Sequence, residues 1–193
     1  MSLQKEQERR LVEACKRGQR LAQRELYDRY AKAMLNTAHR ILNDREEARD
    51  VLQESFLKVF QRMGQYRSEA SLGAWIKRIV VNTALNQLKK RGPLLNSDLE
   101  VVQEEPVANE QGEQQLHLKL AMDALAALPD GYRTVVTLYL LEGYDHSEIS
   151  EILGIGLSTS LSQYARGKKK LRTIIQKMQE NGSDRTILPI SPR

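Results

Sequence analysis

The sequence predicts an all-α fold of two small helical domains joined by a flexible acidic linker. Before Pro93 and after Leu116 the apolar residues recur every three or four positions, which is the period of a helix and not of a strand. Between these stretches lie six acidic residues, no Lys or Arg, Pro106 and Gly112, a composition typical of a linker. The predicted parts are, in chain order, a first domain at 10–92, the linker at 93–115, a second domain at 116–178 and a disordered tail at 179–193.

Three helices fit the first domain. One follows the apolar stripe over 21–41. A second, whose stripe covers 48–63, begins after the capping residue Asp44 and stops at Gly64. A third buries its apolar face over 72–88 and ends in a run of cations, which suit the negative end of the helix dipole. A bundle of three helices is therefore expected.

Four helices fit the second domain. The first ends at the Leu-Pro-Asp-Gly breaker at 128–131 and the second at Gly143. A short helix over 145–153, a glycine-containing turn at 154–156 and a helix over about 158–176 then follow. A short helix, a tight turn and a second helix form the helix-turn-helix pattern, in which the second helix can enter a DNA major groove.

Composition excludes several classes of protein. The formal net charge is +5 and the pI is about 9.3, which fits a basic, soluble chain. No apolar run approaches the roughly 20 residues of a membrane helix and the first ten residues are polar, so we expect a cytoplasmic protein without membrane insertion. A single cysteine excludes an internal disulfide, and three scattered histidines exclude a zinc cluster. Phosphate-binding loops and hydrolase motifs are absent, so no enzyme, metal or cofactor is expected.

Two separate segments have a composition that suits nucleic acid. Residues 161–177 carry six cations and no acid, and residues 65–91 carry six cations and one acid. Within the latter, Arg78, Asn82 and Asn86 follow one another at steps of four residues, so a helix presents them on one face. Two basic faces indicate a bipartite contact with nucleic acid; the alternative is a pair of ordinary solvated helix faces.

Four further side chains have two interpretations each. Tyr66 lies beside a cation in the loop before the third helix and could stack on unpaired bases. Taken singly, however, Tyr66 and Trp75 favour packing in the core. His146, beside Asp145 and Glu148, could belong to an acid-base cluster, but it is better explained as an exposed residue beside a helix N-cap. Cys15, next to two cations, could be a thiol of lowered pKa, but it is better explained as incidental.

Three segments carry the most specific patterns in the chain. Residues 50–58 read DVLQESFLK, residues 75–82 read WIKRIVVN and residues 128–135 read LPDGYRTV. In this order they resemble the D-x-x-Q-E-x-F segment, the W-[IL]-x-R-I-A-x-N segment and the start of the second domain in the extracytoplasmic-function (ECF) sigma factors of bacterial RNA polymerase. The resemblance covers about 21–175. It implies a sigma-70-like architecture, with a sigma2-like first domain and a sigma4-like helix-turn-helix domain.

The resemblance also implies a function, that of a bacterial transcription initiation factor with no catalysis of its own. Such a factor binds the RNA polymerase core and directs it to promoters. The helix with the D-x-x-Q-E pattern would contact the clamp of the polymerase's largest subunit. The core-binding candidates are Asp50, Gln53, Glu54, Leu57 and Phe60, the last of which suits the hydrophobic core equally well.

The resemblance implies that both domains read promoter DNA. In the family, the loop before the tryptophan and the helix after it capture the minus-10 element on the displaced strand and aid promoter melting. The helix-turn-helix reads the minus-35 element as a duplex. The minus-10 candidates are Tyr66, Arg67, Ser68, Lys77, Arg78, Asn82 and Asn86. The minus-35 candidates are Ser158, Thr159, Ser160, Ser162, Gln163, Arg166, Lys168 and Lys169. The linker would thread toward the RNA exit path, and a small anti-sigma factor would cover both basic faces.

Four positions depart from the family pattern. Leu161 and Gln163 replace two usual cations of the recognition helix, and Asn86 stands where aspartate is frequent. Gly167 replaces the usual alanine, at a cost of about 1 kcal/mol of helix stability. These departures predict a weak minus-35 affinity or an unusual promoter. They also leave two alternatives: a stand-alone helix-turn-helix regulator, against which segment 50–58 argues, and a sigma-like adaptor that binds polymerase without reading promoters.

Overall fold

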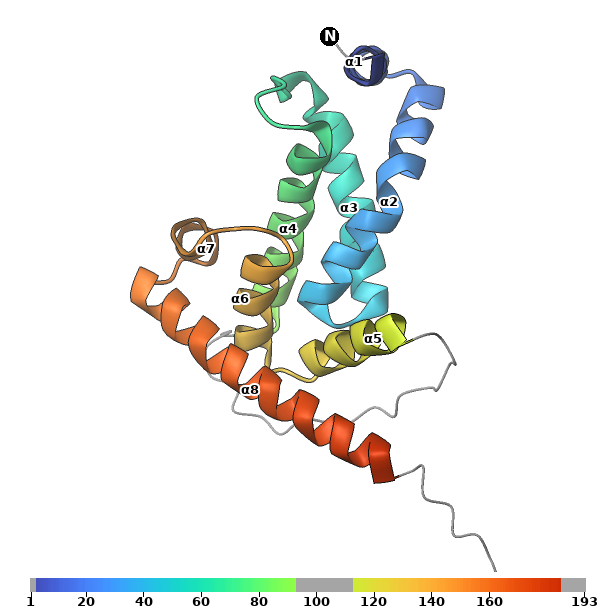
Figure 1. Ribbon diagram of the computed structural model, residues 1–193. Helices are drawn as coiled ribbons and strands as arrows, with labels where there is room; N and C mark the ends of the chain where they lie inside the picture. Colours follow the sequence, from blue (N-terminus) through green and yellow to red (C-terminus); the bar gives the residue numbers. More distant parts are fainter. Residues whose placement is uncertain (1–2, 93–112, 185–193) are drawn as a thin grey trace, which may run out of the picture. The chain divides into compact units, whose positions relative to one another are not determined.

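The computed structural model describes residues 3–92 and 113–184, and every regular element in these ranges is a helix. The prediction of an all-α fold is confirmed. The chain divides into two compact units, Met1–Pro93 and Leu94–Arg193, which we call unit 1 and unit 2 (Figure 1). Most of the predicted linker and the end of the predicted tail lie outside the described residues. Within the described ranges, no helix is long and apolar enough to cross a membrane.

Unit 1 is a bundle of three long helices with a further helix packed against it. Helices α2, α3 and α4 pack against one another pairwise, and α1 packs against α2 and against the short 3₁₀ turn after α3. Helix α3 ends before Gly64 and not at it, because Gly64 lies within the 3₁₀ turn. The elements are α1 (Leu3–Lys16), α2 (Arg20–Leu42), α3 (Arg45–Gln61), the 3₁₀ turn (Met63–Gln65) and α4 (Leu72–Lys90).

The core of unit 1 explains why its long helices follow the apolar periodicity. Side chains without exposed surface line the inner faces of all three bundle helices, among them Leu26 and Ile41 in α2, Val59 in α3, and Ile76 and Leu88 in α4. Burying one such side chain is worth roughly 1.5–3 kcal/mol relative to leaving it exposed. The apolar stripe of each helix therefore determines which face turns inward.

Local hydrogen bonds fix where these helices begin and end. The Asp44 carboxylate accepts a hydrogen bond from the Glu47 amide at 2.8 Å, and the Ser71 hydroxyl accepts one from the Ala74 amide at 3.2 Å. Each bond satisfies an amide that a helix start would otherwise leave unpaired. Asn43 adopts the left-handed conformation, with φ of 53°, and ends α2 just after the predicted apolar stripe.

Arg91 joins three helix ends in unit 1. Its guanidinium donates a hydrogen bond to the Leu42 carbonyl oxygen at the end of α2, at 2.9 Å. The same group forms an ion pair with Glu47 in the first turn of α3, at 2.8 Å. Because Arg91 directly follows α4, one side chain connects the ends of α2 and α4 with the start of α3.

Helix α1 was not expected from the sequence. Its buried residues are Leu11, Val12 and Cys15, and most of the remaining side chains are charged or amide groups. Burial raises the pKa of the Cys15 thiol, and the carboxylate of Glu25 raises it further. The thiol is therefore held neutral, which suits a packing residue and not a reactive thiolate.

The described residues of unit 2 form four helices, and the last and longest of them contacts the other three. Helix α8 packs against α5, α6 and α7, and α7 also contacts α6. The predicted helix-turn-helix is formed by α7 and α8, and α8 continues beyond the expected end near residue 176. The helices are α5 (Glu113–Ala126), α6 (Asp130–Leu140), α7 (His146–Leu153) and α8 (Leu157–Asp184).

Both ends of α7 carry strong local signals. Asp145 and Glu148 form a complete capping box: the Asp145 carboxylate accepts from the Glu148 amide at 2.8 Å, and the Glu148 carboxylate accepts from the Asp145 amide at 2.9 Å. Gly154 ends the helix with φ of 69°, a left-handed conformation that glycine adopts without strain. The turn into α8 is thus specified by the sequence around it.

Helix α8 approaches α6 closely at Gly167. A Cβ atom at this position would lie 2.8 Å from Val136 Cγ2 and 3.3 Å from Tyr132 Cβ. Any side chain would push the two helices apart or displace Val136 from the small core that it forms with Leu125 and Leu128. Glycine at this position therefore permits the close packing of α8 on α6. The sequence alone predicted only its unfavourable effect on helix stability.

Candidate functional site

The predicted core-binding residues lie along one face of α3. Asp50, Gln53, Glu54 and Leu57 are exposed, and Phe60 is half-buried. Their spacing of three and four residues places them on adjacent turns of one side of the helix. The opposite side of α3 faces the bundle core, so this face is available to a partner without any change in the fold.

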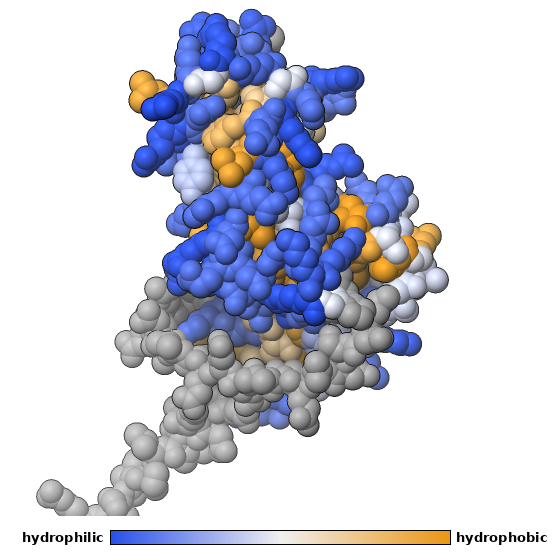
Figure 2. Space-filling model, turned by 180° about the vertical axis from the view of Figure 1, so that it is seen from behind, coloured by the Kyte–Doolittle hydropathy of each residue, from blue (hydrophilic) through white to orange (hydrophobic). Residues whose placement is uncertain are grey.

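The centre of the α3 face is apolar. Leu57 is 62% exposed, and the Phe60 ring lies 6.0 Å from the Phe56 ring at the edge of the core. Phe60 thus packs partly against the core and keeps part of its ring exposed on this face. Seen from behind, apolar surface interrupts the hydrophilic cover of unit 1 (Figure 2). Beside it, Glu54 forms an ion pair with Lys58 at 2.7 Å.

A second row of polar side chains follows α4. Arg78, Asn82 and Asn86 are exposed on consecutive turns, and Lys77 is half-buried beside them. The opposite face of α4 packs into the bundle. One guanidinium and two amides in a row suit phosphate contact and hydrogen bonding to base edges.

Tyr66 does not lie where a base could stack on it. Its side chain is 7% exposed, its hydroxyl donates to the Ala70 carbonyl oxygen at 2.9 Å, and its ring centroid lies 5.4 Å from that of Trp75. The expectation that Tyr66 stacks on DNA is therefore wrong for this conformation, because the ring fills the core. Arg67 and Ser68 in the same loop are exposed.

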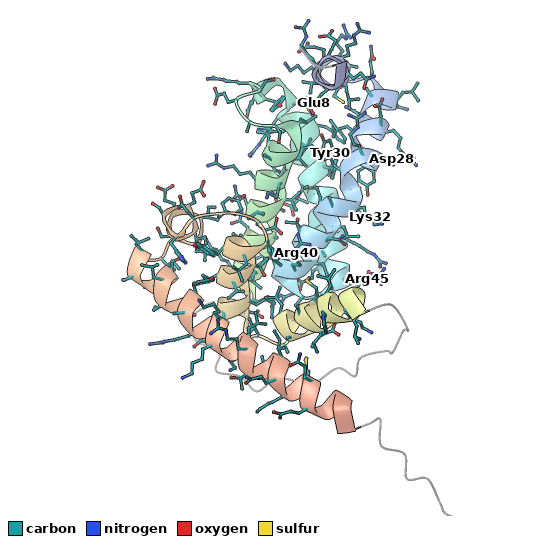
Figure 3. All side chains as sticks on the ribbon, in the orientation of Figure 1. Glu8, Asp28, Tyr30, Lys32, Arg40 and Arg45 are labelled. Atoms are coloured by element: carbon teal, nitrogen blue, oxygen red, sulfur yellow. The ribbon has the colours of Figure 1, made fainter. Side chains whose placement is uncertain are left out.

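A second tyrosine supports the start of α4 from α2. Tyr30 reaches Gly73 in the first turn of α4, where a Cβ atom would lie 3.1 Å from the Tyr30 ring (Figure 3). Burial raises the pKa of the Tyr30 hydroxyl, and the carboxylate of Glu8 on α1 raises it further. Tyr30 of α2 therefore lies against the first turn of α4 and within the electrostatic influence of Glu8 on α1.

The predicted residues of α8 divide into three sets. One set consists of exposed residues on the outer side of the helix: Ser158, Ser162, Arg166, Lys168 and Lys169. Thr159 and Gln163 are half-buried, and Ser160 is fully buried. The exposed set combines two hydroxyl groups near the helix start with three cations in the following turns, so it suits base edges first and phosphates beyond.

Ser160 joins the two helices of the helix-turn-helix. Its side chain has no exposed surface, and its Oγ lies 2.9 Å from His146 Nδ1 on α7. The His146 ring stacks on Tyr139 at 4.5 Å between centroids and meets the Tyr164 ring edge-on at 5.3 Å. The expectation of DNA contact by Ser160 is therefore wrong here, and so is that of a freely exposed His146, because both residues hold α7 against α8.

Two other predicted residues of α8 make contacts within unit 2. The Gln163 Oε1 atom is buried, whereas Lys168 stays exposed and its Nζ atom lies 5.4 Å from the Tyr164 ring centroid one turn earlier, within cation–π range. The remaining exposed candidates with no such inward contact are Ser158, Ser162, Arg166 and Lys169. Across the described parts of the chain, no group of His, Cys, Asp and Glu residues could hold a metal ion.

Two family models match the chain, one in each unit. Residues 26–93 match sigma-70 region 2, and residues 118–171 match sigma-70, region 4. The chain belongs to the ECF sigma-70 family. As an ECF sigma factor it is a transcription initiation factor, and the family resemblance drawn from the three sequence segments is confirmed.

Similar proteins cover nearly the whole chain. The sigma factor is 27% identical to RNA polymerase sigma-H factor of Pseudomonas aeruginosa over 186 residues, which cover 90% of this chain and 96% of that protein. It is 29% identical over 179 residues to the ECF RNA polymerase sigma-E factor of Haemophilus influenzae, covering 86% and 94%. Its fold resembles the sigma factor RpoE of Bartonella quintana, solved in complex with the anti-sigma factor NepR. The TM-score is 0.54 at 21% identity, covering 79% and 96%.

Proposed function

We propose that this sigma factor binds the RNA polymerase core through α3, opens promoters with α4 and reads an upstream duplex element with α8. The observation that carries the proposal is the separation of three exposed polar faces, each opposite the packing side of its own helix. Each face can engage a partner while its helix stays packed. In this proposal unit 1 has the sigma2-like role and unit 2 the sigma4-like role.

The α3 face has the character of a protein interface. An exposed leucine, Leu57, lies among the exposed polar groups Asp50, Gln53 and Glu54. Protein interfaces typically place an apolar anchor inside a polar rim. The acidic groups would meet cations of the polymerase clamp, and Leu57 would enter a pocket between its helices.

The α4 face and the loop before it suit a single strand. Arg78 can contact a backbone phosphate, and Asn82 and Asn86 can hydrogen-bond the edges of unpaired bases. Capturing displaced bases offsets part of the cost of unpairing them. This face would therefore recognise the minus-10 element and aid promoter melting, with Arg67 and Ser68 as further contacts.

The exposed residues of α8 suit the major groove of a duplex minus-35 element. Ser158 and Ser162 lie in the first turns, which in a helix-turn-helix contact base edges, and Arg166 and Lys169 in the following turns would contact phosphates. Polymerase would supply the chemistry, and this chain would catalyse nothing itself. Its site of action would be the cytoplasm, where the polymerase and the promoters are.

An anti-sigma factor is a further proposed partner. The related fold of RpoE from Bartonella quintana is known with the anti-sigma factor NepR bound. By analogy, a small protein would cover the basic faces of α4 and α8 and keep this chain from its promoters. The acidic linker would thread toward the RNA exit path of the polymerase.

The experiment that tests the proposal is transcription by bacterial core polymerase on a pooled library of genomic DNA fragments. It is run with and without the full-length chain at two salt concentrations, because phosphate contacts weaken with salt. We expect discrete new start sites that share two upstream elements. No new starts despite binding to core would favour the adaptor, and no binding to core would favour the stand-alone regulator.

A variant pair tests the α3 face separately. Gln53→Ala with Glu54→Ala should weaken association with core polymerase without lowering the melting temperature, because both side chains are exposed. Arg24→Ala with Asp28→Ala is a matched control, since these residues form an exposed ion pair on α2. An unchanged core affinity for the first pair would remove those residues from the interface.

A further inference from the structure

The first two turns of α8 present two leucines to solvent. Leu157 is 52% exposed and Leu161 is 47% exposed, and the two lie one helical turn apart. Leu161 lies off the side of α8 that packs, on which Ser160, Tyr164 and Gly167 lie, and Leu157 lies at the edge of that side, three residues before Ser160. The exposed surface of the first two turns of α8 therefore carries apolar side chains at Leu157 and Leu161. A cation-rich recognition helix would carry charged side chains at such positions.

The surroundings of these leucines favour DNA over a protein partner. Between Leu157 and Tyr164 the helix carries no charged residue, and cations begin at Arg166. No acidic residue occurs in α8 before Glu180. An apolar patch followed by cations and free of acids is complementary to a groove whose floor consists of base edges and whose rims carry phosphates. Apolar surface is visible on unit 2 in the view from behind as well (Figure 2).

The chemistry of the major groove identifies the feature that leucine can recognise. Each base edge offers hydrogen-bond donors or acceptors, and the C5-methyl group of thymine is the apolar group in the code. A leucine side chain cannot hydrogen-bond, so it can distinguish thymine only through that methyl. The exposed Ser158 and Ser162 beside the leucines can hydrogen-bond neighbouring edges.

We infer that Leu157 and Leu161 determine promoter specificity by contacting thymine methyl groups in the upstream duplex element. This inference rests on the proposed function of α8. Two contacts on the packing side of the helix support it: the hydrogen bond between Ser160 and His146, at 2.9 Å, ties α8 to α7, and Gly167 lets α8 pack closely on α6. Both limit rotation of α8 about its axis, so the leucines are held toward the groove.

The test replaces thymine by deoxyuridine, which lacks only the C5-methyl group. The probe is the upstream duplex element obtained from the transcription experiment, with each thymine substituted in turn. The holoenzyme of full-length chain and core polymerase binds each duplex in competition with the unmodified one. At one or two positions the substitution should weaken binding roughly fourfold, the value of one buried methyl group.

Variants of the two leucines test whether they cause the weaker binding to deoxyuridine-containing duplexes. Leu161→Ala or Leu157→Ala should lose the sensitivity to deoxyuridine at one position while keeping it at the other. Leu140→Ala is the matched control, because Leu140 is 51% exposed on α6, and it should behave as the unsubstituted chain. Circular dichroism and the melting temperature check that each variant folds.

Several outcomes would overturn the inference. Selective binding that no deoxyuridine substitution alters would mean that no methyl group is read, although the proposed function of α8 would stand. An upstream duplex element that contains no thymine would overturn the inference in the same way and would also leave the proposed function of α8 intact. Loss of core affinity in Leu161→Ala, with methyl sensitivity intact, would place the leucines against polymerase. Absence of any sequence-selective binding would instead remove the proposed function itself.

Discussion

The two basic helices, α4 and α8, are built in opposite ways. Helix α4 lies in a bundle and buries eight residues, among them Leu72, Ile76 and Val80. In the part of α8 whose side chains the structure describes, only Ser160 and Gly167 are buried, although α8 contacts every other helix of its unit. The exposed candidate residues of α4 therefore lie on a helix that the rest of the bundle holds in place. Helix α8, in contrast, itself holds the other helices of unit 2 together. Substitutions should separate binding from stability in α4 more cleanly than in α8.

The largest expected effect tests the scaffold under α4. Ile76→Ala should destabilise unit 1 by about 2–5 kcal/mol, because it removes a fully buried side chain and leaves a cavity. Leu171→Ala in α8 should cost less, since that side chain is only half-buried. Urea unfolding followed by circular dichroism measures both. Equal losses in the two variants would contradict the proposed difference between the units.

The next effect concerns the exposed row of α4. Arg78→Ala with Asn82→Ala should reduce promoter opening roughly 5- to 150-fold, the range of one lost base contact, while core affinity and melting temperature stay unchanged. Permanganate footprinting of unpaired thymines measures opening. A parallel loss of core affinity would show that this row has a structural or core-binding role.

A smaller effect is expected where α8 crosses α6. Gly167→Ala should destabilise unit 2 by up to about 2 kcal/mol, because the strain of overpacking exceeds the roughly 1 kcal/mol gained in helix propensity. Val136→Ala removes the nearest atom, so the double variant should lose less than the sum of the single variants. Additive losses would mean that the two residues do not compete for space.

The smallest effect compares the caps of the two units. Asp145→Ala should cost unit 2 about 1 kcal/mol, because it removes one half of a complete capping box, and Asp145→Asn should cost less. Ser71→Ala at the start of α4 should cost about the same in energy, but it leaves the larger core of unit 1 intact. Thermal unfolding measures both. A much greater loss at Ser71 would reverse the comparison.

Much of the fold could be predicted because its signals are local. The apolar stripes, the cap at Asp44, the capping box at Asp145 and the glycine at 154 each act within a few residues. Helix α1 could not be predicted in this way, since Leu11 and Val12 amount to little apolar surface until α2 covers them. From the sequence alone, a polar N-terminal segment of this kind is expected to stay in solvent and not to pack as a helix.

The exposure of candidate residues was predicted well where it follows from helical spacing, as at Asp50 on α3 and Asn82 on α4. It was predicted poorly where a polar or aromatic group is recruited by a distant one. Tyr66 is buried against Trp75, and Ser160 is bonded to His146 fourteen residues earlier. Spacing along one helix carries no information about such pairs, because they depend on how two elements pack.

Arg91 has a mechanical consequence for unit 1. Any pull on the chain beyond Gly92 reaches the bundle at the end of α4, where the Arg91 guanidinium holds the Leu42 carbonyl oxygen and the Glu47 carboxylate. A load applied there should be shared with the end of α2 and the start of α3, so we expect the last turn of α4 to resist fraying under tension.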